Sequence, residues 1–257
     1  MSKITEAFKN KKLFIAYLMA GDPALEKTAE YILTLQNAGA GLIEIGIPFS
    51  DPIAEGEVIQ GANIRALSNS IKLNDIFDML VQIKDKITVP LVFMTYINPL
   101  FVYGYDKFFA MCEICGISGV IVPDLPFEEQ DEIKSIMKKY GIDIITLVSP
   151  TSSKERTKNI AENAQGFIYL VSSMGVTGVR SNITTNIKSI VAEIKKNTDI
   201  PVAVGFGVSK PAQVAEFSKY ADGVIVGSAI VRIIEEFGEN AAKPLSEYVK
   251  NMVKALS

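Results

Sequence analysis

The sequence predicts an α/β fold, a single (β/α)8 TIM barrel with parallel strands and an extra N-terminal helix, over residues 1–257. Strand-like apolar runs alternate with helical patterns along the whole chain, and about eight such units fit its 257 residues. The runs are apolar throughout, as in parallel strands that are buried on both faces. An open doubly wound sheet is the alternative, but the number of units and the lack of GxGxxG after the first strand disfavour it.

The units follow one another in order. Strand-like runs cover residues 13–20, 42–47, 90–96, 119–124, 142–148, 166–173, 201–207 and 223–229. Helical patterns cover residues 24–39, 74–86, 106–116, 127–141, 182–197, 210–221 and 229–237. Several of them end in glycine, which commonly terminates a helix in the left-handed conformation. No linker, charge block or low-complexity segment divides the chain, so one domain is expected.

Composition narrows the function classes. The net charge of −3 offers no basic stripe for nucleic acid. No segment reaches the roughly 18 uninterrupted apolar residues that a membrane span needs. The N-terminal stretch MSKITEAFKNKK lacks the apolar core of a signal peptide, so a cytoplasmic location is expected.

The chain has no histidine, which excludes histidine bases, histidine-ligated zinc and Ser-His-Asp triads. Its two cysteines, Cys112 and Cys115, have the spacing of a redox pair, but such a pair requires a strand-to-helix turn. Here they come late in an amphipathic helix, so we expect structural, buried thiols and no metal site. The chemistry must rely on carboxylates, hydroxyls, lysines or backbone groups.

Glu44 lies inside the apolar run LIEIGI, where an unpaired carboxylate is costly. Strand alternation places the isoleucines of this run on the helix-facing side, and Leu42, Glu44 and Gly46 on the side that faces the barrel interior. Glycine at position 46 would leave space above the carboxylate. Burial would raise the pKa of Glu44 and suit it to proton transfer, because barrel enzymes keep their acids and bases at this end of the strands. An ion pair inside the barrel is the alternative.

The loop that follows carries three further carboxylates, Asp51, Glu55 and Glu57, among proline and glycine. Carboxylates in a surface loop are usually only solvated, so position alone favours none of them.

Glycine-containing strand ends at residues 174–178, 204–209 and 226–234 predict a phosphate site. Glycine lets backbone N–H groups approach an anion closely, and Gly227 and Ser228 open a short helix whose N-terminus attracts one. The ends of strands seven and eight are the usual phosphate site of this architecture. Plain turn chemistry is the alternative.

A general base and a phosphate site in a chain without histidine limit the kinds of reaction that are possible. Aldol-type cleavage needs an electron sink, yet no strand run contains a lysine for a Schiff base, and no histidine holds a metal. The substrate would have to supply the sink itself, as an electron-rich heteroaromatic ring does after protonation.

LIEIGIPFSDPIAEG, VPDLPFEE, YLVSSMGVTGVR, VGFGVS and IVGSAIVRII together resemble the tryptophan synthase alpha subunit family. The resemblance runs through essentially the whole chain, in the right order and spacing. It implies a lyase of tryptophan biosynthesis that cleaves indole-3-glycerol phosphate to indole and glyceraldehyde 3-phosphate by a retro-aldol reaction. It also implies a beta-subunit partner that carries pyridoxal phosphate (PLP) in an alpha2beta2 complex, with no cofactor in this chain.

The resemblance assigns three catalytic residues. Glu44 matches the family's glutamate that moves protons to indole C3 and from the glycerol hydroxyl. Glu55 occupies the position of the second carboxylate, which holds the indole N–H and is commonly aspartate. The extra methylene changes its reach but keeps its charge. Tyr169 matches the active-site tyrosine of the sixth strand.

Other positions follow the family pattern. Those that match its phosphate site are Gly178, Gly207, Gly227 and Ser228. Those that match the wall of its indole pocket are Tyr17, Ile59, Met94, Tyr96, Phe206 and Ile225. Those that resemble lid and support positions are Asp22, Asp51, Asn98, Asp124 and Thr177, with the lid itself running from Ser172 to about Ser189.

Three alternatives stay open. The chain could be a weakly catalytic subunit that regulates its beta partner, or a free-standing lyase that releases indole. An isomerase on a related phosphate-binding barrel is the third, but the LIEIGIPFSDP segment does not support it.

Overall fold

The computed structural model describes residues 2–171, 183–205 and 207–256, and within them eight parallel strands close into a barrel in chain order. Closure comes from the pairing of β8 with β1, which rules out the open sheet and confirms the predicted barrel. The strands are β1 (Leu13–Met19), β2 (Leu42–Gly46), β3 (Leu91–Met94), β4 (Ile117–Ile121), β5 (Asp143–Val148), β6 (Ile168–Val171), β7 (Val202–Gly205) and β8 (Gly223–Val226).

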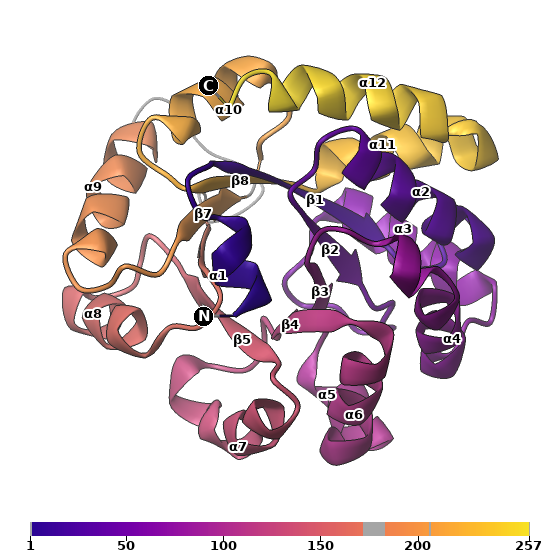
Figure 1. The fold of residues 1–257 in the computed structure, drawn as a ribbon, viewed down its shortest axis with the longest axis horizontal. Coiled ribbons are helices and arrows are strands. Elements are labelled where there is room, and N and C mark those ends of the chain that lie inside the picture. Colours follow the sequence, from indigo (N-terminus) through magenta and orange to yellow (C-terminus); the bar gives the residue numbers. More distant parts are fainter. Residues whose placement is uncertain (1, 172–182, 206, 257) are drawn as a thin grey trace.

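Helices form the outer layer around the strands (Figure 1). They are α1 (Lys3–Ala7), α2 (Leu25–Asn37), α3 (Glu57–Ser68), α4 (Leu73–Ile83), α5 (Ile97–Tyr103), α6 (Tyr105–Cys115), α7 (Asp131–Lys139), α8 (Lys154–Asn163), α9 (Ile183–Lys195), α10 (Pro211–Ser218), α11 (Ser228–Phe237) and α12 (Ala242–Val253). In the described part of the chain three 3-10 turns accompany them, at Lys84–Lys86, Phe127–Glu129 and Gly238–Asn240.

Some boundaries differ from those predicted. β4 begins at Ile117, two residues early, because its pairing with β3 continues past a register shift next to Leu91. The helix predicted from residue 127 begins only at Asp131, after a 3-10 turn. Glu57, which the sequence suggested as a loop residue, is the first residue of α3. The patterns read from the sequence also do not include α3, α5, α8 and α12.

Strand alternation divides the core into two parts, as the sequence of β2 predicts. Ile43, Ile45 and Ile47 pack in the layer between strands and helices, whereas Leu42 packs inside the barrel. β1 behaves in the same way, since Leu13 and Ile15 belong to the interior. Glu44, between two outward isoleucines, therefore faces inward.

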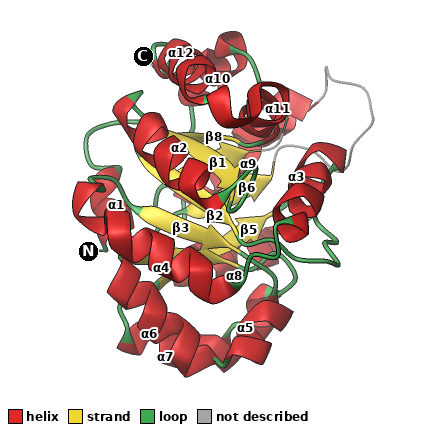
Figure 2. Ribbon diagram, turned by 90° about the vertical axis from the view of Figure 1, so that its right-hand side faces the viewer, coloured by secondary structure: helices red, strands yellow, loops and turns green. Residues whose placement is uncertain are grey.

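The predicted extra helix, α1, covers one end of the barrel. Ile4 and the following Phe8 pack into the interior cluster, and the Phe8 ring lies 5.8 Å from the Phe167 ring. The side view in Figure 2 places α1 at one end of the strands and α3 toward the other. The second end is the carboxyl-terminal end, where α3 and α5 follow β2 and β3.

Cys112 and Cys115 are both buried free thiols in α6. Burial raises the pKa of the Cys115 thiol to about 11 and that of Cys112 well above its ordinary value. Thiols held in the protonated form are poor nucleophiles, which agrees with the structural role predicted for them.

None of the helices in the described residues combines the length and the apolar character needed to cross a bilayer.

Candidate active site

Glu44 is a buried carboxylate in the barrel interior, only 1% exposed. Its register partner on β1 is Tyr17, which is also buried. Within the described part of the chain, its Oε1 atom has no hydrogen-bond partner. An ion pair, the alternative considered for Glu44, does not occur among the described residues, which leaves a carboxyl group available for a ligand.

Burial raises the pKa of Glu44 to about 8. The cause is desolvation, which disfavours the charged form. Tyr17 and Tyr169 both lie within electrostatic range, and Glu44 helps to raise the pKa of each phenol. At neutral pH the Glu44 carboxyl group is therefore largely protonated, with two neutral phenols near it.

Two glycines make room for these tyrosine rings. A Cβ at Gly46 would collide with the Tyr17 hydroxyl, and one at Gly205 would lie 2.6 Å from the Tyr169 hydroxyl. The space that Gly46 leaves was expected above Glu44. It is the Tyr17 hydroxyl that occupies it.

Glu55 lies in the loop between β2 and α3 and is partly buried, whereas Asp51 and Glu57 are exposed. Burial raises the pKa of Glu55 to about 7, while hydrogen bonds from Tyr96 and Asn63 act in the opposite direction. Asn63 of α3 donates its side-chain N–H to Glu55 Oε2. Partial burial therefore distinguishes Glu55 from the exposed Asp51 and Glu57. The sequence of the loop alone does not show this difference.

The predicted pocket residues that the structure describes lie at the same end of the barrel or in its interior. Tyr17 forms an apolar cluster with Ile59 and Met94, which joins β1, α3 and β3 at the carboxyl-terminal end of the barrel. Tyr96 is not part of that cluster. Its hydroxyl accepts a hydrogen bond from the N–H of Ala54 (3.0 Å), the residue before Glu55. Ile225 packs deeper, in the same interior cluster as Tyr169.

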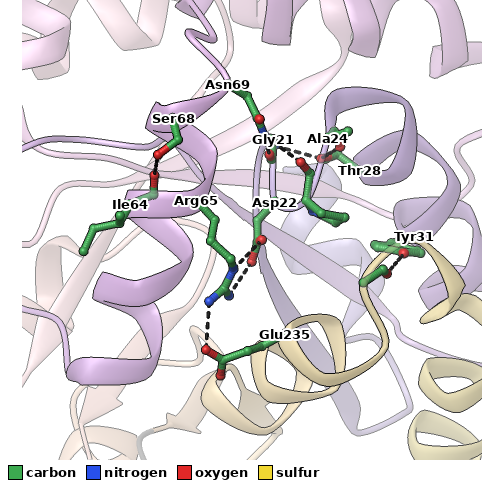
Figure 3. A network of polar contacts seen from close by, with 12 residues as sticks. Gly21, Asp22, Ala24, Thr28, Tyr31, Ile64, Arg65, Ser68, Asn69 and Glu235 are labelled. Atoms are coloured by element: carbon green, nitrogen blue, oxygen red, sulfur yellow. Dashed lines mark hydrogen bonds and ion pairs between the residues drawn. The ribbon is translucent and has the colours of Figure 1, made fainter.

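Asp22, a predicted support residue, lies at the carboxyl-terminal end of β1 and is 1% exposed. Arg65 of α3 donates to both of its carboxylate oxygens at 2.8 Å and also to Glu235 of α11 at 2.9 Å (Figure 3). Asn69 donates to the carbonyls of Gly21 and Pro23 in the same loop. Arg65 therefore joins three elements, the β1–α2 loop, α3 and α11.

Arg65→Met should lower the free energy of unfolding by about 3 kcal/mol, because it leaves the buried Asp22 carboxylate without its partner. Urea denaturation would measure the loss. Lys139→Met is the matched control, because its pair with Asp106 is exposed on both sides and should contribute nothing measurable. Equal stability of wild type and Arg65→Met would contradict the expectation.

The other support residues differ in role. Asp124 accepts hydrogen bonds from the Ile97 N–H, so it caps the first turn of α5. Asn98 is exposed on α5. Asp51 is exposed and accepts a hydrogen bond from Ser50. Of the three, only Asp124 is held in a defined contact that orients an element next to the Glu55 loop.

Three of the four predicted phosphate residues, Gly207, Gly227 and Ser228, lie after the ends of β7 and β8. Gly207 has a φ of +74°, a conformation that favours glycine. Gly227 occupies the N-cap of α11, whose first residue is the exposed Ser228. Since glycine has no side chain with which to cap the helix, the first N–H groups of α11 are open to an anion.

Three predicted site residues, Thr177, Gly178 and Phe206, lie outside the described residues, as does most of the predicted lid. The last part of that segment, from Ile183 onward, belongs to α9. Among the described residues, cysteine and carboxylate side chains do not form groups of three that could hold a metal ion.

Sequence reasoning missed Asn63 and Arg65. Both lie on α3, for which the sequence predicted no helix. Asn63 contacts residues 8 and 14 positions away, and Arg65 contacts residues 43 and 170 positions away. The burial of Asn63 and the pairing of Arg65 with the buried Asp22 become apparent only when α3 is placed beside the end of β1.

The chain is similar to known proteins over its whole length. A family model described as tryptophan synthase alpha chain matches residues 4–256. A tryptophan synthase alpha chain from Lactiplantibacillus plantarum is 45% identical over 100% of this chain and 97% of its own. One from Petrotoga mobilis is 46% identical over 100% and 99%.

Solved structures agree. The tryptophan synthase alpha subunit of Legionella pneumophila matches with a TM-score of 0.91 and 36% identity, covering 100% of this chain and 98% of the other. A chain in the tryptophan synthase a2b2 complex of Pyrococcus furiosus matches with a TM-score of 0.88 and 39% identity, covering 95% and 99%. Because the family model spans residues 4–256 and these relatives are 45% and 46% identical, the chain belongs to the tryptophan synthase alpha chain family.

Proposed function

We propose that this chain is a cytoplasmic lyase that cleaves indole-3-glycerol phosphate to indole and glyceraldehyde 3-phosphate, as the alpha subunit of a tryptophan synthase. The observation that carries the proposal is the inward Glu44 carboxyl group, buried without a partner for Oε1 among the described residues. An acid–base catalyst of a barrel enzyme requires a carboxyl group with a shifted pKa near the carboxyl-terminal ends of the strands, and Glu44 meets both conditions.

Glu44 supplies the protons. With a pKa of about 8 it is protonated at neutral pH and donates its proton to C3 of the indole ring. The resulting carboxylate accepts the proton of the glycerol hydroxyl as that carbon becomes a carbonyl. The carbon–carbon bond breaks in the same step, and its electron pair returns to the ring, so Glu44 ends protonated and indole neutral.

Glu55 and Tyr169 assist. Protonation at C3 places positive charge on the ring, and an ionised Glu55 that accepts a hydrogen bond from the indole N–H stabilises that charge. The protonated ring is the electron sink, which explains how the reaction proceeds without a Schiff-base lysine. The Tyr169 ring, near Glu44 in the barrel interior, would pack against the indole.

The phosphate would bind at Gly207, Gly227 and Ser228, where the N-terminus of α11 offers N–H donors. Thr177 and Gly178 are proposed to complete this side of the site when the substrate is bound. Asp51 and Asn98 remain candidates for support residues.

Ser228→Asp should weaken binding of glyceraldehyde 3-phosphate by tenfold or more, because a carboxylate at the start of α11 repels the phosphate. Binding of indole, measured in parallel by calorimetry, should stay within about twofold. Ser228→Asn, similar in size but neutral, is the control. Equal losses for both ligands in a folded variant would contradict the phosphate assignment.

A beta-subunit partner in an alpha2beta2 complex forms part of the proposal, and the PLP chemistry would belong to that partner. Large apolar side chains are exposed near the carboxyl-terminal end of the barrel, with Phe101 68% and Val102 76% exposed on α5 and Ile53 79% exposed near Glu55. Such exposure marks interaction surfaces, which supports a partner that covers this end. Gel filtration with and without the beta subunit tests it, and separates a complex-forming subunit from a free-standing lyase.

An assay of indole release from indole-3-glycerol phosphate tests the function itself. Release by the isolated chain would exclude a purely regulatory subunit. No release, either alone or with the beta subunit present, would overturn the proposal.

A further inference from the structure

Asn63 is the polar side chain that joins the Glu55 loop to α3. It is 2% exposed, and both ends of its amide are used. Its Nδ2 donates to Glu55 Oε2, and its Oδ1 accepts a hydrogen bond of 2.9 Å from the Phe49 N–H. Phe49 lies near the start of the loop between β2 and α3, and Glu55 lies near its end. A single amide therefore fixes the loop backbone and the carboxylate together.

The two amide contacts also fix the orientation of the side chain. The Phe49 N–H requires an oxygen, so the opposite end of the amide must be the NH2 group that faces Glu55. That arrangement offers a donor, and a donor favours the ionised carboxylate over the protonated one.

Other groups face Glu55 from the surrounding elements. Tyr96, the N-cap of α5, hydrogen-bonds to the carboxylate, and Asp124 lies beyond it. Tyr17 of β1 faces both Glu55 and Glu44. Lysine and arginine are absent from the groups that shift the pKa of Glu55 in the described chain. The donors that oppose burial are thus a phenol and the Asn63 amide. The Tyr96 hydroxyl holds the loop at Ala54, next to Glu55, whereas Asn63 joins Glu55 to the start of the loop at Phe49.

We propose that Asn63 is a positioning residue for the lyase reaction, which holds the Glu55 carboxylate ionised and aimed at the indole N–H by linking it to the Phe49 backbone. The proposal rests on the proposed function, since it assigns Asn63 a role through Glu55. Asn63 contacts Glu55 and the Phe49 backbone, so its role is exerted through another residue.

The expected pH profile follows from two carboxyl groups. Activity needs Glu55 ionised and Glu44 protonated, so kcat/KM should rise near pH 7 and fall near pH 8, as macroscopic values of the pair. Removing the Asn63 donor destabilises the carboxylate and raises the pKa of Glu55. The rising limb then moves to higher pH, and the window of activity narrows.

Asn63→Leu, which is similar in volume and removes both contacts, should shift the rising limb upward by about one pH unit. At pH 7 kcat/KM should fall about fivefold, because the ionised fraction of Glu55 drops from about one half to about one tenth. Asn63→Asp keeps an acceptor for the Phe49 N–H but places a second carboxylate against Glu55, so it should shift the limb at least as far. Two variants that disturb the loop differently guard against the failure of either one to fold.

Asn69→Leu is the matched control. Asn69 is the C-cap of α3, and it donates to two backbone carbonyls of the β1–α2 loop rather than to a carboxylate. Its loss should lower stability, measured by thermal melting, and leave both limbs of the pH profile in place.

Epistasis separates positioning from general stabilisation. In a Glu55→Gln background the carboxylate is gone, so adding Asn63→Leu should change kcat/KM less than twofold. The proposal is overturned if Asn63→Leu costs as much in that background as in wild type, or if it leaves the rising limb unmoved.

A carboxyl 13C NMR titration removes the dependence on activity. The Glu55 signal, assigned by its absence in Glu55→Gln, should titrate at higher pH in Asn63→Leu than in wild type. If wild type releases no indole, the proposed function fails, while this titration still decides whether Asn63 holds Glu55 ionised. An unchanged Glu55 titration overturns the Asn63 role even in an active enzyme.

Discussion

Glu44→Gln is expected to lower the turnover of indole-3-glycerol phosphate by about 10²–10⁴-fold, the weight of one positioned acid–base group. Glutamine keeps the size and the inward position of the side chain, but it neither donates a proton to indole C3 nor accepts one from the glycerol hydroxyl. Substrate affinity should stay within a few-fold, since Glu44 acts mainly in the transition state. Steady-state kinetics of the purified variant with the beta subunit added would measure the loss.

The fold should survive this change. Oε1 of Glu44 has no partner in the described chain, so glutamine breaks no hydrogen bond at that atom, and it removes the cost of keeping a carboxyl group protonated at neutral pH. Circular dichroism and calorimetric binding of the substrate are the controls. A variant that retained more than about a third of wild-type turnover would show that Glu44 is not the catalyst.

Glu55→Ala and Glu55→Gln should lower turnover by about 10²-fold or more, because both remove the negative charge that faces the indole N–H. The interaction strengthens as the ring becomes cationic, so the loss should appear in kcat rather than in substrate affinity. Glu55→Asp should stay within about tenfold of wild type, since an aspartate serves if the loop shifts slightly.

A neighbouring carboxylate provides an internal control. Asp51 and Glu57 are exposed on either side of Glu55, and Glu57→Gln, which changes a residue outside the proposed site, should leave the chemical step unchanged. Normal turnover of Glu55→Ala would instead make Glu55 a bystander, and one of these two residues would become the next candidate.

Much of the barrel was predictable because its signals are local. The alternation in LIEIGI placed Glu44 inward, and the structure agrees, since Ile43 and Ile45 pack toward the helices. The start of α11 at Ser228 follows directly from the glycine and serine before an apolar helix. Family resemblance added the choice of Glu55, which its position in the loop did not favour.

What the sequence could not provide depends on contacts between distant segments. The pairing of Arg65 with Asp22 spans 43 positions and exists only because α3 packs beside the end of β1. Asn63 was missed because an asparagine on an unrecognised helix carries no signal of its own. The space beside Gly46 was assigned to Glu44 because a one-strand pattern does not reveal that Tyr17 of the neighbouring strand fills it.

The two raised carboxyl groups also connect folding with proton uptake. In the unfolded chain both would titrate near the ordinary value of 4.5, whereas in the folded chain Glu44 and Glu55 titrate near 8 and 7. Near pH 6 folding therefore takes up close to two protons at these positions. Since the folded state binds more protons than the unfolded state, their contribution to stability declines as pH rises from about 4.5 to 8. A salt-bridged carboxylate has the reverse dependence, so this barrel carries its acid at a thermodynamic disadvantage that is complete once the pH exceeds about 8.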